Sequence, residues 1–506
     1  NYFLPTINGL IYFDKPLLSY WAIIPFAFNG VVTEASARMP GALAGIGTLI
    51  ITFAMGRRLF DNRTGLISSF LLMTSAMFVL WSRTASAEIL NVLAIWLSLI
   101  FFIRGAHKGS LPYVILMYGT CAISPFFKGP VAPAVVFFSI TFYSIFETIS
   151  EAKHNNYRFS ALKESFLLRF RWIISWQGMV GVIIGLVIFT TLLLLPVIVT
   201  GSWSSVELMW RENVQRFFRP FDHIEPFYAY FKHLPVFFLP WTIFMIASCF
   251  FIRQWAKNPP DRFILLITFA IFLFFTISGS RRSYYILPVL PGVAIISGKL
   301  ISDLIKSTVQ PFGKILKMSM ISTCTIIMIA GIGIIVSYFD KRIPSHPSQI
   351  AIGILTILAC ITCLKYFRRK AASRGIAILI AVVFVIELWV FNVGMAAAEK
   401  NRTLRPFAIK VADYLKDVGD ERILLYQGYD SILIFYLKRK PLKVLNTAEE
   451  IRSFQKAHGN GFLIGQLSLI NRFRESGEID GISLICAEKP VTKDNSDNLA
   501  LFSLNR

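Results

Sequence analysis

Long apolar stretches recur along this chain, separated by short polar loops, and they restrict the possible folds more than any other feature. A helix of roughly 20 mostly apolar residues is long enough to cross a lipid bilayer. Hydrophobic residues make up 55% of the 506 residues and charged residues only 16%. The pattern predicts a polytopic α-helical membrane protein with about twelve spans. The predicted spans are 37–56, 64–82, 87–103, 112–127, 130–148, 175–199, 236–252, 263–279, 285–301, 319–338, 349–366 and 375–395.

The basic residues predict how these spans are oriented. The formal net charge is +22, which would suggest a nucleic-acid partner in a water-soluble chain. Here Lys and Arg cluster in alternate short loops, which is typical of cytoplasmic loops and of contacts with lipid headgroups. We therefore expect membrane lipids as partners and no nucleic acid. The opposite, external face receives the segment 1–36, the loop 200–235, the Arg281-Arg282 turn and the chain after residue 396.

The chain changes character near residue 396, where helical and strand-like runs begin to alternate. The pattern predicts a helix over 407–418 and strands over 422–427, 441–446, 461–466 and 482–488. Thr447-x-x-Glu450 is typical of a capping box that opens another helix. We expect three parts: an external loop with interfacial helices (1–36), a transmembrane core (37–395) and a small external α/β domain (396–506). The last part has no phosphate-binding or dinucleotide-binding glycine motif, so catalysis is not expected there.

The predicted external segments carry more charge than membrane topology requires. Charged side chains beside apolar spans are costly and often functional. Arginine and lysine can bind phosphate oxygens, whereas carboxylates can accept a proton or hold a divalent cation. The set therefore favours a phospholipid-like substrate, although scattered anchors at the membrane interface are the alternative. The candidates are the cations Lys15, Lys128, Arg216, Arg281 and Arg282, the carboxylates Asp14, Glu88 and Glu212, and the tyrosines Tyr284 and Tyr285.

A series of motifs closely resembles the bacterial aminoarabinose transferases and related protein-mannosyltransferase-like enzymes, which are C-type glycosyltransferases. The order of the motifs spans nearly the whole membrane part. In sequence order the motifs include Pro5-x-x-Asn8-Gly9, Tyr12-Phe13-Asp14-Lys15-Pro16, Ala37-Arg38-Met39-Pro40, Lys128-Gly129-Pro130, Glu212-Asn213-Val214-Gln215-Arg216, Leu239-Pro240-Trp241 and Ser280-Arg281-Arg282-Ser283-Tyr284-Tyr285.

The resemblance implies an inverting glycosyltransferase at the periplasmic face of the bacterial inner membrane. Such an enzyme moves a sugar from a polyprenyl-phosphate donor to an envelope acceptor, which could be lipid A, a protein or a glycan. The family's catalytic aspartate and first span would precede Asn1, so we name no general base beyond the candidate Glu88. By the same resemblance Lys15 lies near the donor phosphate. Arg216, Arg281, Arg282 and Lys128 are further candidate ligands of the phosphate or headgroup, and Tyr284 and Tyr285 could cap the pocket.

A divalent metal is the only cofactor that the resemblance suggests. Asp14 stands where aminoarabinose transferases carry a glutamate associated with a metal. The family's Glu-His pair is replaced here by Glu212-Asn213, which argues against bound zinc, and His223 in the same loop is the remaining candidate ligand. A transporter or flippase of a charged lipid is the alternative function. Transporters usually carry charges near the bilayer midplane, whereas these charges are predicted at one outer face.

Overall fold

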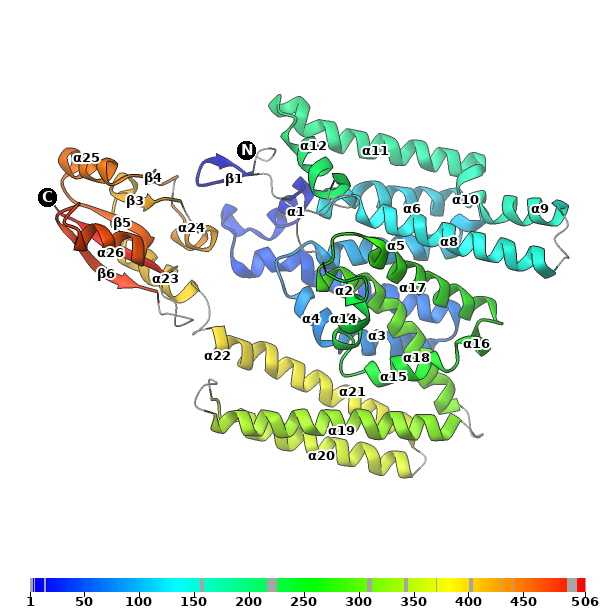
Figure 1. Cartoon of the computed structure of the whole chain (residues 1–506). Coiled ribbons are helices and arrows are strands. Elements are labelled where there is room, and N and C mark those ends of the chain that lie inside the picture. Colours follow the sequence, from blue (N-terminus) through cyan, green and yellow to red (C-terminus); the bar gives the residue numbers. More distant parts are fainter. Residues whose placement is uncertain are drawn as a thin grey trace.

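The structure is a computed structural model, and it describes most of the chain. The described residues are 3, 5–12, 15–154, 159–215, 225–306, 312–340, 345–369, 371–399, 404–428, 430–439, 441–488 and 498–505. A large helical part is joined to a small α/β part that lies at one end of the helices, beside the N-terminal hairpin (Figure 1).

The helical part follows the predicted apolar windows. Its helices are α1 (Leu17–Trp21), α2 (Glu34–Leu59), α3 (Asn62–Met73), α4 (Ala76–Ser82), α5 (Glu88–Arg104), α6 (Leu111–Ile123), α7 (Pro125–Lys128), α8 (Val131–His154), α9 (Phe159–Arg169), α10 (Arg171–Ile174), α11 (Trp176–Thr200), α12 (Ser204–Met209), α14 (Ala229–Phe237), α15 (Thr242–Cys249), α16 (Ile252–Trp255), α17 (Pro259–Ile277), α18 (Leu290–Lys306), α19 (Phe312–Phe339), α20 (Ser348–Arg368), α21 (Ala372–Trp389) and α22 (Met395–Glu399). A 3₁₀ segment, η5 (Ser283–Val289), precedes α18.

Eight helices among the described residues are long and apolar enough to cross a membrane, which confirms a multi-pass membrane protein. The bent pair α3 and α4, which meet at 70°, would make a ninth span. This number is lower than the twelve expected. The windows 87–103, 112–127 and 236–252 are helical, but α5 has 17 residues, α6 has 13 and α15 has 8. Gly105 ends α5, and Pro125 and Pro240 stand where the other helices are interrupted, because proline cannot continue a helix from its interior.

Several helix surfaces are apolar and exposed, as expected for side chains that face lipid. On α11, Ile183, Leu186 and Val187 are each more than half exposed. Other helices enclose a continuous apolar core that includes Trp96 and Trp241, both fully buried. The Trp96 indole donates a hydrogen bond to the Pro288 carbonyl oxygen at 2.9 Å, which ties α5 to η5. This contact fixes two segments that carry candidate site residues.

The α/β part contains a five-stranded sheet in the order β4-β3-β5-β7-β6. Its strands are β3 (Ile423–Tyr426), β4 (Lys443–Leu445), β5 (Gly461–Gln466), β6 (Ile482–Ala487) and β7 (Leu499–Leu504), and its helices are α23 (Arg405–Tyr414), α24 (Ser431–Leu437), α25 (Ala448–His458) and α26 (Leu467–Glu475). Strands β3, β4 and β5 are parallel, whereas β7 is antiparallel to both β5 and β6. The sheet has an apolar cluster on each side. The predicted helix at 407–418 and the four predicted strands are all present, and β7 is an additional strand.

The predicted capping box at the start of α25 is present in part, because the Glu450 carboxylate accepts a hydrogen bond from the Asn446 amide and not from that of Thr447. The Thr447 hydroxyl accepts a hydrogen bond from the Glu450 amide at 3.2 Å. We expect Thr447→Ala to lower the free energy of unfolding of this domain by about 1 kcal/mol, since it leaves an amide of the first turn without its acceptor. Denaturant titration of the purified full chain, followed by a probe attached to the domain, would measure the change. Arg452→Ala, an exposed change on the same helix, is the control, and an equal loss in both variants would contradict the capping role.

Candidate donor-phosphate site

Candidate site residues from four separate segments meet around Lys128. Lys128 ends the short helix α7, which packs against α1 just after Lys15 and also against α5. Glu88 is the first residue of α5, and its carboxylate forms an ion pair with the Lys128 ammonium. The Lys128 side chain is 19% exposed and that of Glu88 12%. An ammonium is therefore held in a mostly dry place by one carboxylate.

The charges around Lys128 affect its protonation. Burial lowers the pKa of Lys128 because it removes water from the ammonium, and Glu88 opposes this effect. Lys15 and Arg282 lower the pKa of Lys128 further by charge repulsion. Lys15 and Arg282 thus each lie close enough to Lys128 to repel its ammonium, with Glu88 as the nearby carboxylate. A bound anion would relieve this repulsion, and a phosphate has the charge and the oxygen acceptors to do so.

Two tyrosines of η5 form an aromatic wall beside these cations. The Lys128 ammonium lies 4.7 Å from the centre of the Tyr285 ring and 5.6 Å from that of Tyr284. Arg282 donates a hydrogen bond from Nη1 to the Tyr284 hydroxyl oxygen at 2.6 Å. The Trp81 ring, at the end of α4, contacts the Tyr284 ring with 4.4 Å between centres. The tyrosines therefore orient Lys128 and Arg282 through cation–π contacts and this hydrogen bond.

Arg281 has different hydrogen-bond partners from its sequence neighbour Arg282. Its guanidinium donates to the Glu225 carbonyl oxygen at 2.7 Å and to the Thr276 carbonyl oxygen at 3.0 Å. These bonds hold the segment around Glu225 against the end of α17. The Glu225 carboxylate in turn pairs with His233 at 2.8 Å. The structure thus gives Arg281 bonds to backbone carbonyls beside the cluster, and its sequence neighbour Arg282 joins the group around Lys128.

Several predicted residues lie outside what the structure describes. Asp14, Arg216 and His223 are outside the described residues, as is the side chain of Glu212. Among the residues that are described, no group of three or more His, Cys, Asp or Glu side chains could hold a metal ion. The described side chains around Lys128 form a cationic site with one carboxylate, which fits a phosphate.

Two residues that support this site were not predicted. Trp81 holds Tyr284, and Tyr230 on α14 is fully buried near Tyr285 and Arg281. Burial raises the pKa of Tyr230, so its phenol stays neutral. In sequence both look like ordinary interface aromatics. Their contacts are with residues far away in the chain, and no local spacing reveals them.

This fold and this group of cations define a multi-pass membrane protein of the C-type glycosyltransferase fold. Solved structures of ArnT from Cupriavidus metallidurans have the same fold. With the form bound to undecaprenyl phosphate, the TM-score is 0.70 at 16% identity, covering 99% of this chain and 90% of that one. The apo form gives a TM-score of 0.69 at 17% identity.

Sequence comparisons find relatives of the same kind. Residues 14–161 match the family model described as dolichyl-phosphate-mannose-protein mannosyltransferase. An undecaprenyl phosphate-alpha-4-amino-4-deoxy-L-arabinose arabinosyl transferase of Shewanella sediminis is 21% identical over 468 residues, which cover 89% of this chain and 79% of the relative. A protein of Aquifex aeolicus is 29% identical over 65% of this chain, which spans 60% of that relative's length. These matches confirm the resemblance to the aminoarabinose transferases and protein-mannosyltransferase-like enzymes that the motifs predict.

Proposed function

We propose that this protein is an inverting glycosyltransferase that moves a sugar from a polyprenyl-phosphate donor to a cell-envelope acceptor. The observation that supports this most strongly is the convergence of Lys128, Lys15 and Arg282 beside Tyr284 and Tyr285. These cations lie next to apolar helices, so one ligand can place a phosphate among them and an apolar tail along the helices. The similarity to undecaprenyl-phosphate-dependent transferases supports the same donor class. Lipid A, a protein or a glycan are the acceptors that this donor site would serve.

In the proposed reaction, the acceptor attacks the anomeric carbon of the sugar from the face opposite the phosphate. The carbon–oxygen bond to the phosphate breaks, the polyprenyl phosphate leaves with the electron pair, and the acceptor loses a proton. Lys15, Lys128 and Arg282 stabilise the negative charge that grows on the leaving phosphate, which lowers the barrier if their contacts strengthen in the transition state. Arg216 would add a further cation from the loop 200–235, and Arg281 would support that loop's end.

Glu88 has two possible tasks in this scheme. Its ion pair holds Lys128 in place and favours the charged ammonium. Because that pair occupies the carboxylate, we propose positioning of Lys128 as its main role. The acceptor proton would then go to another base, and Glu88 is a candidate for that task only if the ion pair opens when the donor binds.

A binding and transfer assay with the purified full chain tests this function. We expect the protein to bind undecaprenyl phosphate and to release it from an undecaprenyl-phosphate sugar in the presence of acceptor. Mass spectrometry of lipid A, glycoproteins and envelope glycans, with and without the gene, would identify the acceptor. Movement of a charged lipid across vesicles without sugar transfer would instead support a transporter or flippase.

The proposal places the cationic site and the C-terminal domain in the periplasm, because the most basic loops are assigned to the cytoplasm. A reporter that is active only in the cytoplasm, fused after Arg506, should therefore be silent. A reporter that is active only in the periplasm should be active at the same position. The reverse pattern would contradict the proposed orientation.

A divalent metal held by Asp14, Glu212 and His223 remains part of the proposal. These oxygen and nitrogen ligands would suit a divalent cation near the donor phosphate. We expect a chelator to lower transfer and an added divalent cation to restore it. Unchanged transfer by metal-depleted protein would remove these three residues from a metal-binding role.

A further inference from the structure

The segment that carries Lys15 is attached at both of its ends to the C-terminal domain. The hairpin β1 (Thr6–Ile7) and β2 (Leu10–Ile11) lies before Lys15, and Glu34 at the start of α2 lies after it. Between these two attachments are Lys15 and α1, which packs against the helix of Lys128. We call residues 5–34 the opening segment.

The first attachment is a two-way amide contact. Asn8 donates from Nδ2 to the Leu442 carbonyl oxygen at 2.9 Å, and the Leu442 amide donates to Asn8 Oδ1 at 2.7 Å. Asn8 and Gly9 form the two-residue turn of the hairpin, with φ of 49° and 81°. Asn-Gly favours this kind of turn because both positions need positive φ. Pro441 packs against Gly9, where an added Cβ would lie 3.1 Å from the proline ring.

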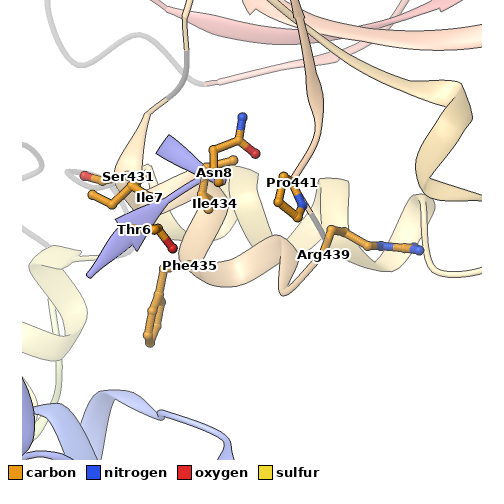
Figure 2. A pocket seen from close by; sticks show the side chains of 9 residues that line it. Thr6, Ile7, Asn8, Ser431, Ile434, Phe435, Arg439 and Pro441 are labelled. Carbon is orange, nitrogen blue, oxygen red and sulfur yellow. The ribbon is translucent and has the colours of Figure 1, made fainter. Parts of the chain in front are cut away.

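A pocket of about 400 Å³ lies where the hairpin meets α24, lined by residues that include Ile7, Asn8, Ile434, Phe435 and Pro441. Figure 2 shows the hairpin crossing this helix, with Asn8 beside Pro441. The nearby Arg439 donates to the Leu415 and Val418 carbonyl oxygens and to the Asp420 carboxylate. The Arg439 guanidinium thus stabilises the C-terminal domain internally. The pocket lies at the contact between the N-terminal hairpin and this domain.

The second attachment holds the other end of the opening segment. The Tyr436 hydroxyl donates to the Glu34 carboxylate, which also pairs with Arg405 at 2.9 Å. Tyr436 is on α24 and Arg405 begins α23, so both partners belong to the C-terminal domain. Thr33 and Ser36 form a capping box that fixes the start of α2 at this point. The C-terminal domain, in which the sequence shows no catalytic motif, therefore contacts and holds the segment that carries Lys15.

We propose that the C-terminal domain positions Lys15 for the donor phosphate by clamping the opening segment through Asn8 and Glu34. The identity of the ligand in this inference rests on the proposed function. The contacts that hold the opening segment do not depend on it. Asn8 and Glu34 are positioning residues, since they act through Lys15. When the clamp is released, Lys15 itself is unchanged, but the opening segment is less ordered. Donor binding must then order this segment, which lowers the affinity for the donor.

The test compares Asn8→Gly and Asn8→Asp in the full chain. Glycine accepts the positive φ and removes both hydrogen bonds, whereas aspartate tolerates that backbone and keeps only the acceptor. Tyr436→Phe removes the second hydrogen bond without losing the ring. Thr6→Ala is the matched control, because Thr6 is exposed on the same hairpin and makes no side-chain hydrogen bond within the described part of the chain.

Two measurements are made on each variant: hydrogen exchange of residues 5–22 and affinity for undecaprenyl phosphate. We expect faster exchange in the Asn8 variants and Tyr436→Phe, with affinity reduced by about five- to tenfold and saturated transfer nearly unchanged. Unchanged exchange would overturn the clamp. Faster exchange with wild-type affinity would overturn its role in positioning Lys15. If the wild-type protein does not bind undecaprenyl phosphate, both the proposed function and the positioning of Lys15 for the donor are wrong. The hydrogen-exchange data still show whether the C-terminal domain holds the opening segment.

Discussion

Replacing Lys15 with alanine is expected to lower sugar transfer by about 10- to 100-fold while the protein remains folded and inserted. The ammonium would lose a charge-assisted contact with the leaving phosphate, which is typically worth about 1.5–3 kcal/mol. The loss is larger if the contact strengthens as the phosphate departs. Steady-state transfer by the purified full chain, with the donor concentration varied, would measure the effect.

Lys232→Ala is the control for Lys15. Lys232 is an exposed lysine on α14 that lies 4.8 Å from the centre of the Tyr228 ring, and we have not placed it among the phosphate ligands. We expect near-normal transfer in that variant. Wild-type activity in Lys15→Ala, or an equal loss in the two variants, would rule out Lys15 as a donor ligand.

The mostly buried pair of Lys128 and Glu88 is expected to show a large effect when only one partner is removed. Lys128→Met leaves the Glu88 carboxylate without its cation, and Glu88→Gln leaves the ammonium without its anion. Breaking a buried pair in this way costs about 3–5 kcal/mol of stability. The double variant removes both charges, so we expect it to recover much of the stability but not the affinity for undecaprenyl phosphate. Additive losses of stability in the double variant would show that the pair is not coupled.

The same pair predicts a change in the pH dependence of transfer. Burial, Lys15 and Arg282 lower the pKa of Lys128, and Glu88 raises it. Without Glu88 the pKa of Lys128 falls further, so the ammonium loses its proton at a lower pH. In Glu88→Gln, transfer should therefore begin to decline at a lower alkaline pH than in the wild type. A uniform loss at every pH, without this shift, would favour Glu88 as the general base.

The sequence predicts the secondary structure better than the partners of its residues. The apolar windows and the Thr447 N-cap have local causes, so they could be located from spacing. The strand β7 was not predicted, because a short apolar run is ambiguous in the sequence. It forms a strand here by pairing with β5 and β6. Among the described residues, fewer helices have the length of a full span than the twelve predicted, because a hydropathy pattern does not show that a helix stops at Gly105 or restarts at Pro125.

The candidate site shows the same distinction. Motif order selected Lys128, Glu88 and Arg282 one by one, but their meeting depends on how α5, α7 and η5 pack. Arg281 and Arg282 are adjacent in sequence and equal in charge, yet the structure gives Arg281 backbone carbonyls as partners and Arg282 the Tyr284 hydroxyl. No local pattern separates them, since those carbonyls belong to segments that come together only in the fold.

The contact of Asn8 with Leu442 joins residues 434 positions apart. During synthesis the opening segment is made long before Leu442, so Asn8 has no Leu442 to bind while the membrane helices insert. Domains generally fold as units in the order in which they are made. The segment that bears Lys15 is therefore held in place only after the membrane helices have been made, and a chain interrupted before the α/β domain would have an incomplete site in the membrane.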